Sequence, residues 1–235
     1  MKATTLFLGM ALLCLRLVAA PAVPVDVVYK PTFLAGDDSW TAGTGYVAKI
    51  GDDCVFLTAH HLFGPDGGLE EDLSPVEARK LFTGLSARSM DDETKVLPSS
   101  EILLIPSAKA FDEQGATRDV AAFCLPGYQG AFLVVAKNAP QPGDTVYLLG
   151  CPRGEEKLRL IPAKVRRAAA NVLEYSFEET GINFGGTSGA PLLNEDGELV
   201  GMNIGGRNAG GKTRGFGNPA ASFAALVAEA LHAKR

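Results

Sequence analysis

The chain has 235 residues, of which 46% are hydrophobic and 21% charged, and its formal net charge is −5. This is ordinary globular composition with enough apolar material for a core, so neither disulfides nor a metal is needed to hold the fold together. The acidic balance argues against nucleic acid and anionic membrane surfaces as partners, because both require a basic protein surface.

The N-terminus has the pattern of a secretory signal. Met1-Lys2 is followed by an apolar run over Leu6–Leu15 and by small residues over Val18–Ala22. The run is shorter than the roughly 20 residues that a transmembrane helix needs. We therefore expect residues 1–22 to be a signal peptide. The mature protein would be secreted or periplasmic, with no membrane contact after the signal is removed; an uncleaved N-terminal anchor is the alternative.

Short apolar runs separated by turn residues follow the signal, and the 27 glycines and 14 prolines favour short strands over long helices. We expect strands at Gly45–Ile50, Cys54–Thr58, Glu101–Ile105, Val120–Leu125, Phe132–Ala136, Thr145–Leu149, Ala163–Arg167, Val172–Phe177, Pro191–Asn194 and Leu199–Ile204. A spacing of roughly 8–12 residues between such runs predicts a β-sandwich or β-barrel rather than alternating strands and helices.

Two helices are expected. Ser74 can cap the first, Pro75 suits its first position and Glu77 completes a capping box, so this helix would run to about Phe82. The second spans residues 220–233, where apolar residues recur at helical spacing and predict one face packed on the body of the protein. These residues are Phe223, Leu226, Val227, Ala230 and Leu231.

Three cysteines, Cys54, Cys124 and Cys151, remain after the signal. All lie in apolar surroundings, and buried inert thiols are the expected state. A Cys54–Cys124 bridge is also possible. Their scattered spacing is not that of a zinc site, and we expect neither a metal nor another cofactor.

Three segments together indicate nucleophilic catalysis. His61 ends the apolar run Phe56-Leu-Thr-Ala-His-His61, Asp119 directly precedes the apolar run Val120–Leu125, and Ser188 lies in the glycine-rich turn Phe184-Gly-Gly-Thr-Ser188-Gly. A serine hydroxyl needs a base within hydrogen-bond reach, and histidine titrates near neutrality. An aspartate on the far ring nitrogen fixes the tautomer. The glycines would let the amides of Gly186 and Ser188 bind the oxyanion.

The order His, Asp, Ser and the motifs around these residues resemble those of trypsin-like serine peptidases, closest to the bacterial Deg/HtrA-type protease domain. The matching segments are Thr58-Ala59-His60-His61, Asp119-Val120-Ala121 and Gly186-Thr187-Ser188-Gly189-Ala190-Pro191. In chain order they exclude an α/β-hydrolase, which uses Ser, Asp, His. Counting from Thr58, the motif makes His61 the base; His60 is the alternative, but adjacent side chains of an extended segment face opposite sides, so both cannot address Ser188.

The resemblance implies an all-β fold of two packed six-stranded antiparallel β-barrels with a C-terminal helix. An N-terminal barrel over residues 23–128 would carry His61 and Asp119, and residues 129–235 would form the second barrel with Ser188 and the helix. Thr187 and Ala190 depart from the usual motif. Thr187 cannot pair with a new N-terminus, so activation by that route is not expected.

The implied activity is endopeptidase cleavage through an acyl-enzyme, on protein or peptide substrates, by a monomer. In this family, the residue six positions before the serine selects the side chain preceding the scissile bond. Ile182 and Asn183 stand there, which favours a small or apolar side chain, unless a loop shift brings Glu178 or Glu179 to that place. The expected substrate-binding residues are Ile182, Asn183, Gly205 and Gly206. A catalytically weak or inactive binding module of the same fold is the alternative function.

Overall fold

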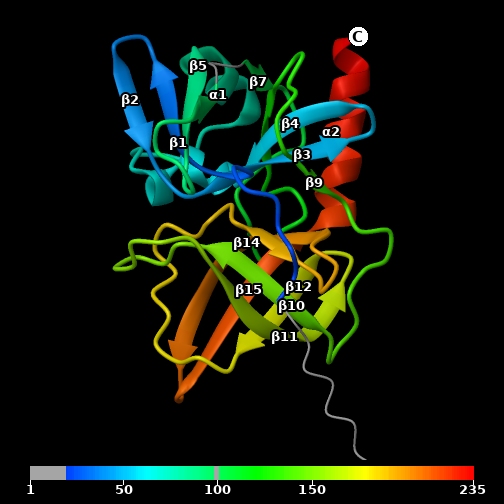
Figure 1. The fold of residues 1–235 in the computed structure, drawn as a ribbon. Helices are drawn as coiled ribbons and strands as arrows, with labels where there is room; N and C mark the ends of the chain where they lie inside the picture. Colours follow the sequence, from blue (N-terminus) through cyan, green and yellow to red (C-terminus); the bar gives the residue numbers. More distant parts are fainter. Residues whose placement is uncertain (1–19, 98–100) are drawn as a thin grey trace, which may run out of the picture.

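The computed structural model describes residues 20–97 and 101–235, which form two β-rich halves, one above the other in Figure 1. The predicted signal peptide, residues 1–22, lies almost entirely outside the described residues. No helix within the described ranges has the length and apolar character needed to span a membrane.

The N-terminal half is a nine-stranded sheet with the order β6-β5-β1-β3-β4-β8-β7, in which β2 pairs with β1 and β9 with β3. The strands are β1 (Val28–Ala35), β2 (Asp38–Thr41), β3 (Gly45–Ile50), β4 (Asp53–Thr58), β5 (Gly84–Ser89), β6 (Val96–Leu97), β7 (Ile102–Leu103), β8 (Ala121–Cys124) and β9 (Leu133–Val134). Its two end strands, β6 and β7, are joined across residues 98–101. Such a stretch spans no more than roughly 18 Å, so the sheet must curl back towards itself.

The C-terminal half is a closed six-stranded barrel with the order β10-β11-β12-β15-β14-β13. Its strands are β10 (Thr145–Gly150), β11 (Arg159–Ala169), β12 (Val172–Phe177), β13 (Pro191–Leu193), β14 (Leu199–Ala209) and β15 (Lys212–Pro219). Buried and less buried residues alternate along β12, as expected for a strand with one face inward. All pairings in this barrel are antiparallel.

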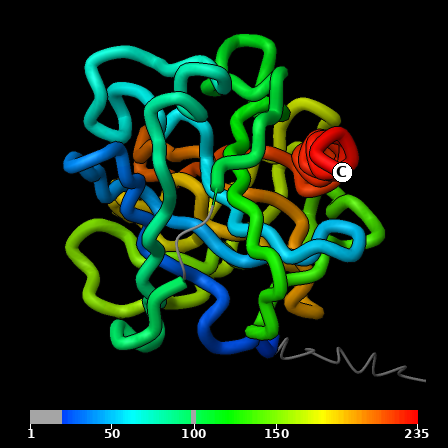
Figure 2. The backbone as a smooth tube through the Cα atoms, turned by 90° about the horizontal axis from the view of Figure 1, so that it is seen from above, coloured from blue at the N-terminus to red at the C-terminus, as the bar shows by residue number. Residues whose placement is uncertain are grey.

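Helix α1 (Pro75–Leu81) begins as predicted: the Ser74 hydroxyl accepts from the Glu77 amide, and the Glu77 carboxylate accepts from the Ser74 amide. Two short 3-10 turns, η1 (His60–Phe63) and η2 (Pro65–Gly67), precede it. Helix α2 (Ala220–Lys234) follows β15 directly and is seen end-on at the edge of the molecule in Figure 2. Both predicted helices are confirmed.

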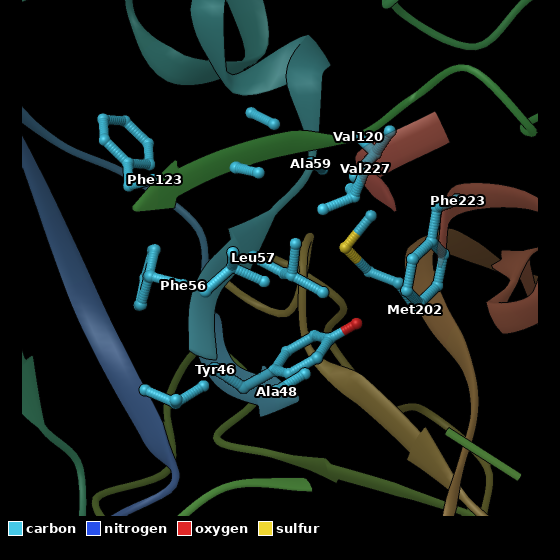
Figure 3. Close-up of a cluster of buried hydrophobic side chains, with 14 of the residues drawn as sticks. Tyr46, Ala48, Phe56, Leu57, Ala59, Val120, Phe123, Met202, Phe223 and Val227 are labelled. Carbon is cyan, nitrogen blue, oxygen red and sulfur yellow. The ribbon is translucent and has the colours of Figure 1, made fainter. Parts of the chain in front are cut away.

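Helix α2 follows the C-terminal barrel in the chain but packs against the N-terminal sheet. Phe223 and Val227 are fully buried in one core cluster with Leu57 and Val120 of the N-terminal half, and Met202 of β14 reaches the same cluster (Figure 3). The two halves therefore share a core, and the helix fastens the end of the second half to the first.

The predicted all-β class with a C-terminal helix is confirmed, and the C-terminal half is the expected six-stranded barrel. The N-terminal half has nine strands instead of six, because the short strands β2, β6 and β9 add to it, and β9 pairs with β3 in parallel. Strands β1, β2, β5, β6 and β15 were not predicted from the sequence, and β11 begins at Arg159 rather than at the predicted Ala163. Strand β15 reads Lys-Thr-Arg-Gly-Phe-Gly-Asn-Pro, whose glycines and proline are typical of a turn. Pairing with β12 on one side and β14 on the other makes it a strand.

The cysteines differ from the expectation of full burial. Cys54, Cys124 and Cys151 are all only partly buried. All three are free thiols, so the structure has no Cys54–Cys124 bridge. The shared core accounts for the packing of the described residues without a covalent link.

Phe223→Ala should lower the free energy of unfolding by about 3–5 kcal/mol, because it opens a cavity at a fully buried position between the two halves. Glu229→Ala, at an exposed site on the same helix, should change it by no more than about 0.5 kcal/mol. Urea denaturation followed by circular dichroism measures both values. Equal effects of the two variants would contradict the shared core.

Candidate active site

His61 and Asp119 meet at the junction of the two halves. His61 lies in η1, just after β4, and Asp119 lies two residues before β8, which pairs with β4. The His61 Nδ1 and the Asp119 Oδ2 are 2.8 Å apart, and the His61 amide donates to Asp119 Oδ1 at 2.9 Å. Because the carboxylate holds both the ring and the backbone of His61, the direction of the imidazole is fixed.

Asp119 is completely buried and is stabilised by N–H donors. Besides the two contacts to His61, its Oδ2 accepts the Phe111 amide at 3.1 Å. A buried carboxylate is costly unless it is paired and hydrogen-bonded, and these contacts supply that compensation. Asp112, in contrast, is exposed and pairs with Lys109 at the surface.

The surroundings of His61 favour its protonated form. Burial alone would lower the pKa of His61, but the hydrogen bond and the negative charge of Asp119 outweigh it, with smaller contributions from Asp66 and Asp72. The pKa of His61 is therefore raised above its ordinary value, which makes the ring a stronger base.

His60 has different surroundings, although the extended segment expected at this point is a 3-10 turn that contains both histidines. Its Nε2 lies 2.9 Å from the carbonyl oxygen of Leu73, and burial lowers its pKa. The ring also packs edge-on against Phe63. His60 therefore contacts the segment before α1 rather than Asp119.

The turn that carries Ser188 requires two glycines. Gly186 and Gly189 both have a φ of +85°, in the left-handed region where the backbone of any residue with a side chain is strained. A Cβ on Gly189 would also overlap the carbonyl oxygen of Thr44. Among the described residues, the amides of Gly186 and Ser188, the two groups predicted to form the oxyanion hole, donate to no protein acceptor.

The Ser188 hydroxyl donates to the carbonyl oxygen of Ile204 at 3.1 Å. Within the described residues it makes no hydrogen bond to His61. A rotation about the serine Cα–Cβ bond moves the oxygen between staggered positions, and such rotations are inexpensive for an unbranched side chain. In the structure, the Ser188 hydroxyl is therefore hydrogen-bonded to the backbone of β14.

A buried polar network supports the turn from the C-terminal barrel. Asn203 donates through Nδ2 to the Thr187 carbonyl at 2.9 Å and to the Thr187 hydroxyl at 3.1 Å, and its Oδ1 accepts the hydroxyl of Tyr175. The backbone of Asn203 also accepts the Gly189 amide at 2.8 Å. Thr187 and Asn203 are completely buried, so the departure at Thr187 is accommodated by a fully bonded side chain.

Thr44 supports the same turn from the N-terminal half. Its amide donates to the Ser188 carbonyl at 2.8 Å, and its hydroxyl donates to the Gly186 carbonyl at 2.6 Å. The Thr58 hydroxyl then donates to the Thr44 carbonyl at 2.7 Å. The carbonyl groups of Gly186 and Ser188, on either side of Thr187 in the chain, are thus oriented by a residue of the other half.

The four predicted substrate-binding residues have different environments. Ile182 is buried in the core of the C-terminal barrel, where its side chain is not available to a ligand. Asn183 folds back to accept the Gly185 amide at 3.1 Å. Gly205 and Gly206 lie on β14, and a Cβ on Gly206 would overlap the Phe184 ring.

Phe184 is therefore the side chain that faces Gly206, a position for which no role was predicted. Thr44 and Asn203 were missed as well. Phe184 begins the glycine-rich segment that indicated Ser188, so its position was a signal that could have found it. Thr44 had no such signal, because its place beside the turn depends on how the halves pack.

No cluster of histidine, cysteine or acidic side chains within the described residues has the arrangement of a metal site. The chemistry that the arrangement can perform is proton transfer by His61, because the segment just before it, at Thr58 and Ala59, lies against Gly189 of the serine turn. The amides of Gly186 and Ser188 lie in the same turn as the Ser188 hydroxyl.

Comparison with known proteins decides the family. A family model described as a trypsin-like peptidase domain matches residues 43–202, more than half of the chain. The chain belongs to the trypsin-like peptidase family. It is thus classed with the serine peptidases, which are hydrolases. No curated protein sequence matches it.

Solved structures share the fold at low sequence identity. A serine endoprotease from Yersinia pestis has a TM-score of 0.60 at 18% identity, covering 90% of this chain and 65% of that one. The Rv3671c protease from M. tuberculosis in its active form has 0.56 at 20%, covering 97% and 93%. The HtrA-type protease AlgW with tripeptide has 0.58 at 13%, covering 90% and 62%. The chain thus spans under two thirds of the Yersinia pestis protein and of AlgW.

Thr44→Val should lower the free energy of unfolding by about 1–3 kcal/mol, because it leaves the Gly186 carbonyl without its donor while nearly conserving volume. Thr44→Ser, which keeps the hydroxyl, is the matched control and should stay closer to wild type. Thermal and urea denaturation of the three proteins give the comparison. If the valine and serine variants were equally stable, the hydrogen bond from the Thr44 hydroxyl to the Gly186 carbonyl would not contribute to stability.

Proposed function

We propose that the chain is an exported serine endopeptidase in which Ser188 is the nucleophile, His61 the general base and Asp119 the residue that orients His61. The observation that carries the proposal is the buried His61–Asp119 pair, 2.8 Å apart. Its histidine lies two residues after Ala59, whose amide nitrogen would be 3.1 Å from a Cβ on Gly189 in the turn that presents Ser188. A raised pKa keeps His61 basic enough to take the serine proton.

In the proposed mechanism, the Ser188 hydroxyl leaves the Ile204 carbonyl and turns to His61. His61 takes its proton as the oxygen attacks the substrate carbonyl, and the amides of Gly186 and Ser188 stabilise the oxyanion. The protonated ring then gives the proton to the leaving amine. Water then attacks the acyl-enzyme while His61 takes a proton from the water. His61 gives that proton to the Ser188 oxygen as the acid product leaves.

Ser188→Ala should reduce peptide turnover by at least about 10⁴-fold while leaving the fold intact, because the nucleophile is lost. Covalent labelling by a fluorophosphonate probe, followed by intact mass, should occur in the wild-type protein and be absent in the variant. A wild-type protein that folds but neither reacts with the probe nor cleaves peptides would favour the binding-module alternative.

His61→Ala should lower turnover by about a thousandfold or more, whereas His60→Ala should cost no more than about tenfold. The imidazole ring of His61 acts as a base only in its neutral form, so kcat/KM should fall as the pH drops. Because the pKa of His61 is raised, the midpoint of this fall should lie above the ordinary histidine value of about 6.5. The pH profile of His60→Ala should keep that midpoint. Reversed effects of the two alanine variants would assign the base to His60.

Export and substrate choice are further parts of the proposal. The apolar N-terminal segment supports export, and mass spectrometry of the protein from cell fractions would reveal the loss of residues up to about Ala22. The Phe184 ring over Gly206 supports a preference for small or apolar side chains before the scissile bond. Cleavage of a peptide library by wild type and Phe184→Ala would test this, since the smaller side chain should admit larger residues.

A further inference from the structure

A pocket of about 670 Å³ lies between the two halves, beside the candidate active site. Its first wall is the loop from Phe111 to Ala116. The facing wall is the outer surface of the barrel strands β11, β12, β14 and β15. Loop and barrel are joined where the Ala116 amide donates to the Asn171 carbonyl and the Asn171 side chain donates to the Gln114 carbonyl, each at 2.9 Å.

Positive charge dominates the lining of this pocket. Four arginines line it: Arg166, Arg167, Arg207 and Arg214. The two acidic lining residues already have cationic partners, since Asp112 pairs with Lys109 and Glu174 with Arg167. In the described part of the chain, the other three arginines make no ion pair and no side-chain hydrogen bond. The protein as a whole carries a net charge of −5, so the positive charge of this pocket is opposite in sign to the net charge of the protein.

Local backbone structure produces the concentration of arginines. Strand β11 has a register shift between Val165 and Arg167, so Arg166 is an extra residue and both neighbouring arginines line the pocket. Bulges of this kind redirect side chains and are common beside active sites. On the adjoining strands, Arg207 of β14 lies directly opposite Arg214 of β15. Like charges opposite each other destabilise a sheet, so folding alone does not favour this pair.

Two aromatic rings connect the pocket to His61. The Phe111 ring lies 6.2 Å from the His61 ring and 5.0 Å from the Phe216 ring, measured between centroids, and both phenylalanines line the pocket. An extended peptide advances roughly 3.4 Å per residue. The Ser188 hydroxyl contacts Ile204 of β14, and Arg207 lies three residues further along that strand, a distance of roughly 10 Å. A side chain about two to four residues from a bond cleaved at Ser188 can therefore reach the arginines.

We propose that this arginine pocket binds an acidic side chain of the substrate, an Asp or Glu two to four residues from the scissile bond, and so selects acidic peptide segments. The proposal rests on the peptidase function proposed above. Arginine matches a carboxylate because its planar fork can make two parallel hydrogen bonds. A peptide fits better than nucleic acid, because the basic surface is a single pocket on an acidic protein rather than a stripe that follows a phosphate backbone.

The first test compares two peptide substrates that differ only in Glu or Gln at those positions. Wild type should cleave the Glu peptide with a kcat/KM about tenfold higher, and this preference should shrink as salt is added. Arg207→Gln/Arg214→Gln should abolish the preference, and Arg207→Glu/Arg214→Glu should reverse it towards a Lys peptide. The matched control, Lys80→Gln/Arg88→Gln, removes the same charge elsewhere on the surface and should keep it.

A second measurement separates this proposal from the peptidase proposal. Fluorescence anisotropy with labelled Glu and Gln peptides and the Ser188→Ala protein reports binding without any turnover. Tighter binding of the Glu peptide, lost in Arg207→Gln/Arg214→Gln, supports the pocket even if wild type proves inactive. Equal binding and equal cleavage of the two peptides, within about twofold, would overturn it.

Arg214→Gln should also raise the midpoint of thermal unfolding, because it relieves the repulsion from Arg207 across the strands. This result would show that the variants remain folded and that the arginine pair costs stability. A lowered midpoint would mean that the two arginines support the fold, and it would overturn the argument that the pair is retained for binding.

Discussion

The candidate active site depends on hydrogen bonds that cross from one half of the molecule to the other at Thr44. The turn that presents Ser188 belongs to the C-terminal barrel, yet the carbonyl groups of Gly186 and Ser188 are held by the hydroxyl and the amide of Thr44. Thr44 is itself fixed by Thr58 at the end of β4, the strand that leads to His61. His61 and the serine turn are therefore positioned by the same short stretch of the N-terminal sheet.

Asp119 couples the candidate catalytic residues to the arginine pocket. Its carboxylate accepts the ring and the amide of His61 and also the amide of Phe111, whose ring lines the pocket. Asn218 of β15 donates to the Asp119 carbonyl at 3.3 Å and ties this loop to the barrel. Since the Asp119 carboxylate contacts both His61 and the backbone of Phe111, a shift of Phe111 would change the position of the carboxylate and with it the orientation of the His61 ring.

Sequence reasoning predicted the elements whose signals are local. Strands β3 and β12 and helix α1 have clear apolar patterns or capping residues, and their predicted bounds are close to those observed. The motifs around His61 and Asp119 likewise placed these residues correctly at strand ends that meet. Strand β1 was missed because Pro31 interrupts its apolar pattern, although the same residue pairs with Ala87 of β5 in the structure.

What could not be predicted arises only after strands pair. The bulge in β11 and the meeting of Arg207 with Arg214 depend on register, and neither leaves a pattern in the surrounding sequence. The same holds for Asn203, which reads as an ordinary strand residue but lies behind the serine turn. Its role follows from the contact with Thr187, sixteen positions away in the chain.

Helix α2 has a consequence for how the chain acquires its fold during synthesis. The helix is made after both sheets, yet Phe223 and Val227 complete the core of the first half. Domains usually fold as units in the order in which they emerge from the ribosome. Here the part of the N-terminal core that Phe223 and Val227 fill stays open until α2 has been translated, so the order of synthesis itself delays completion of the core that the two halves share.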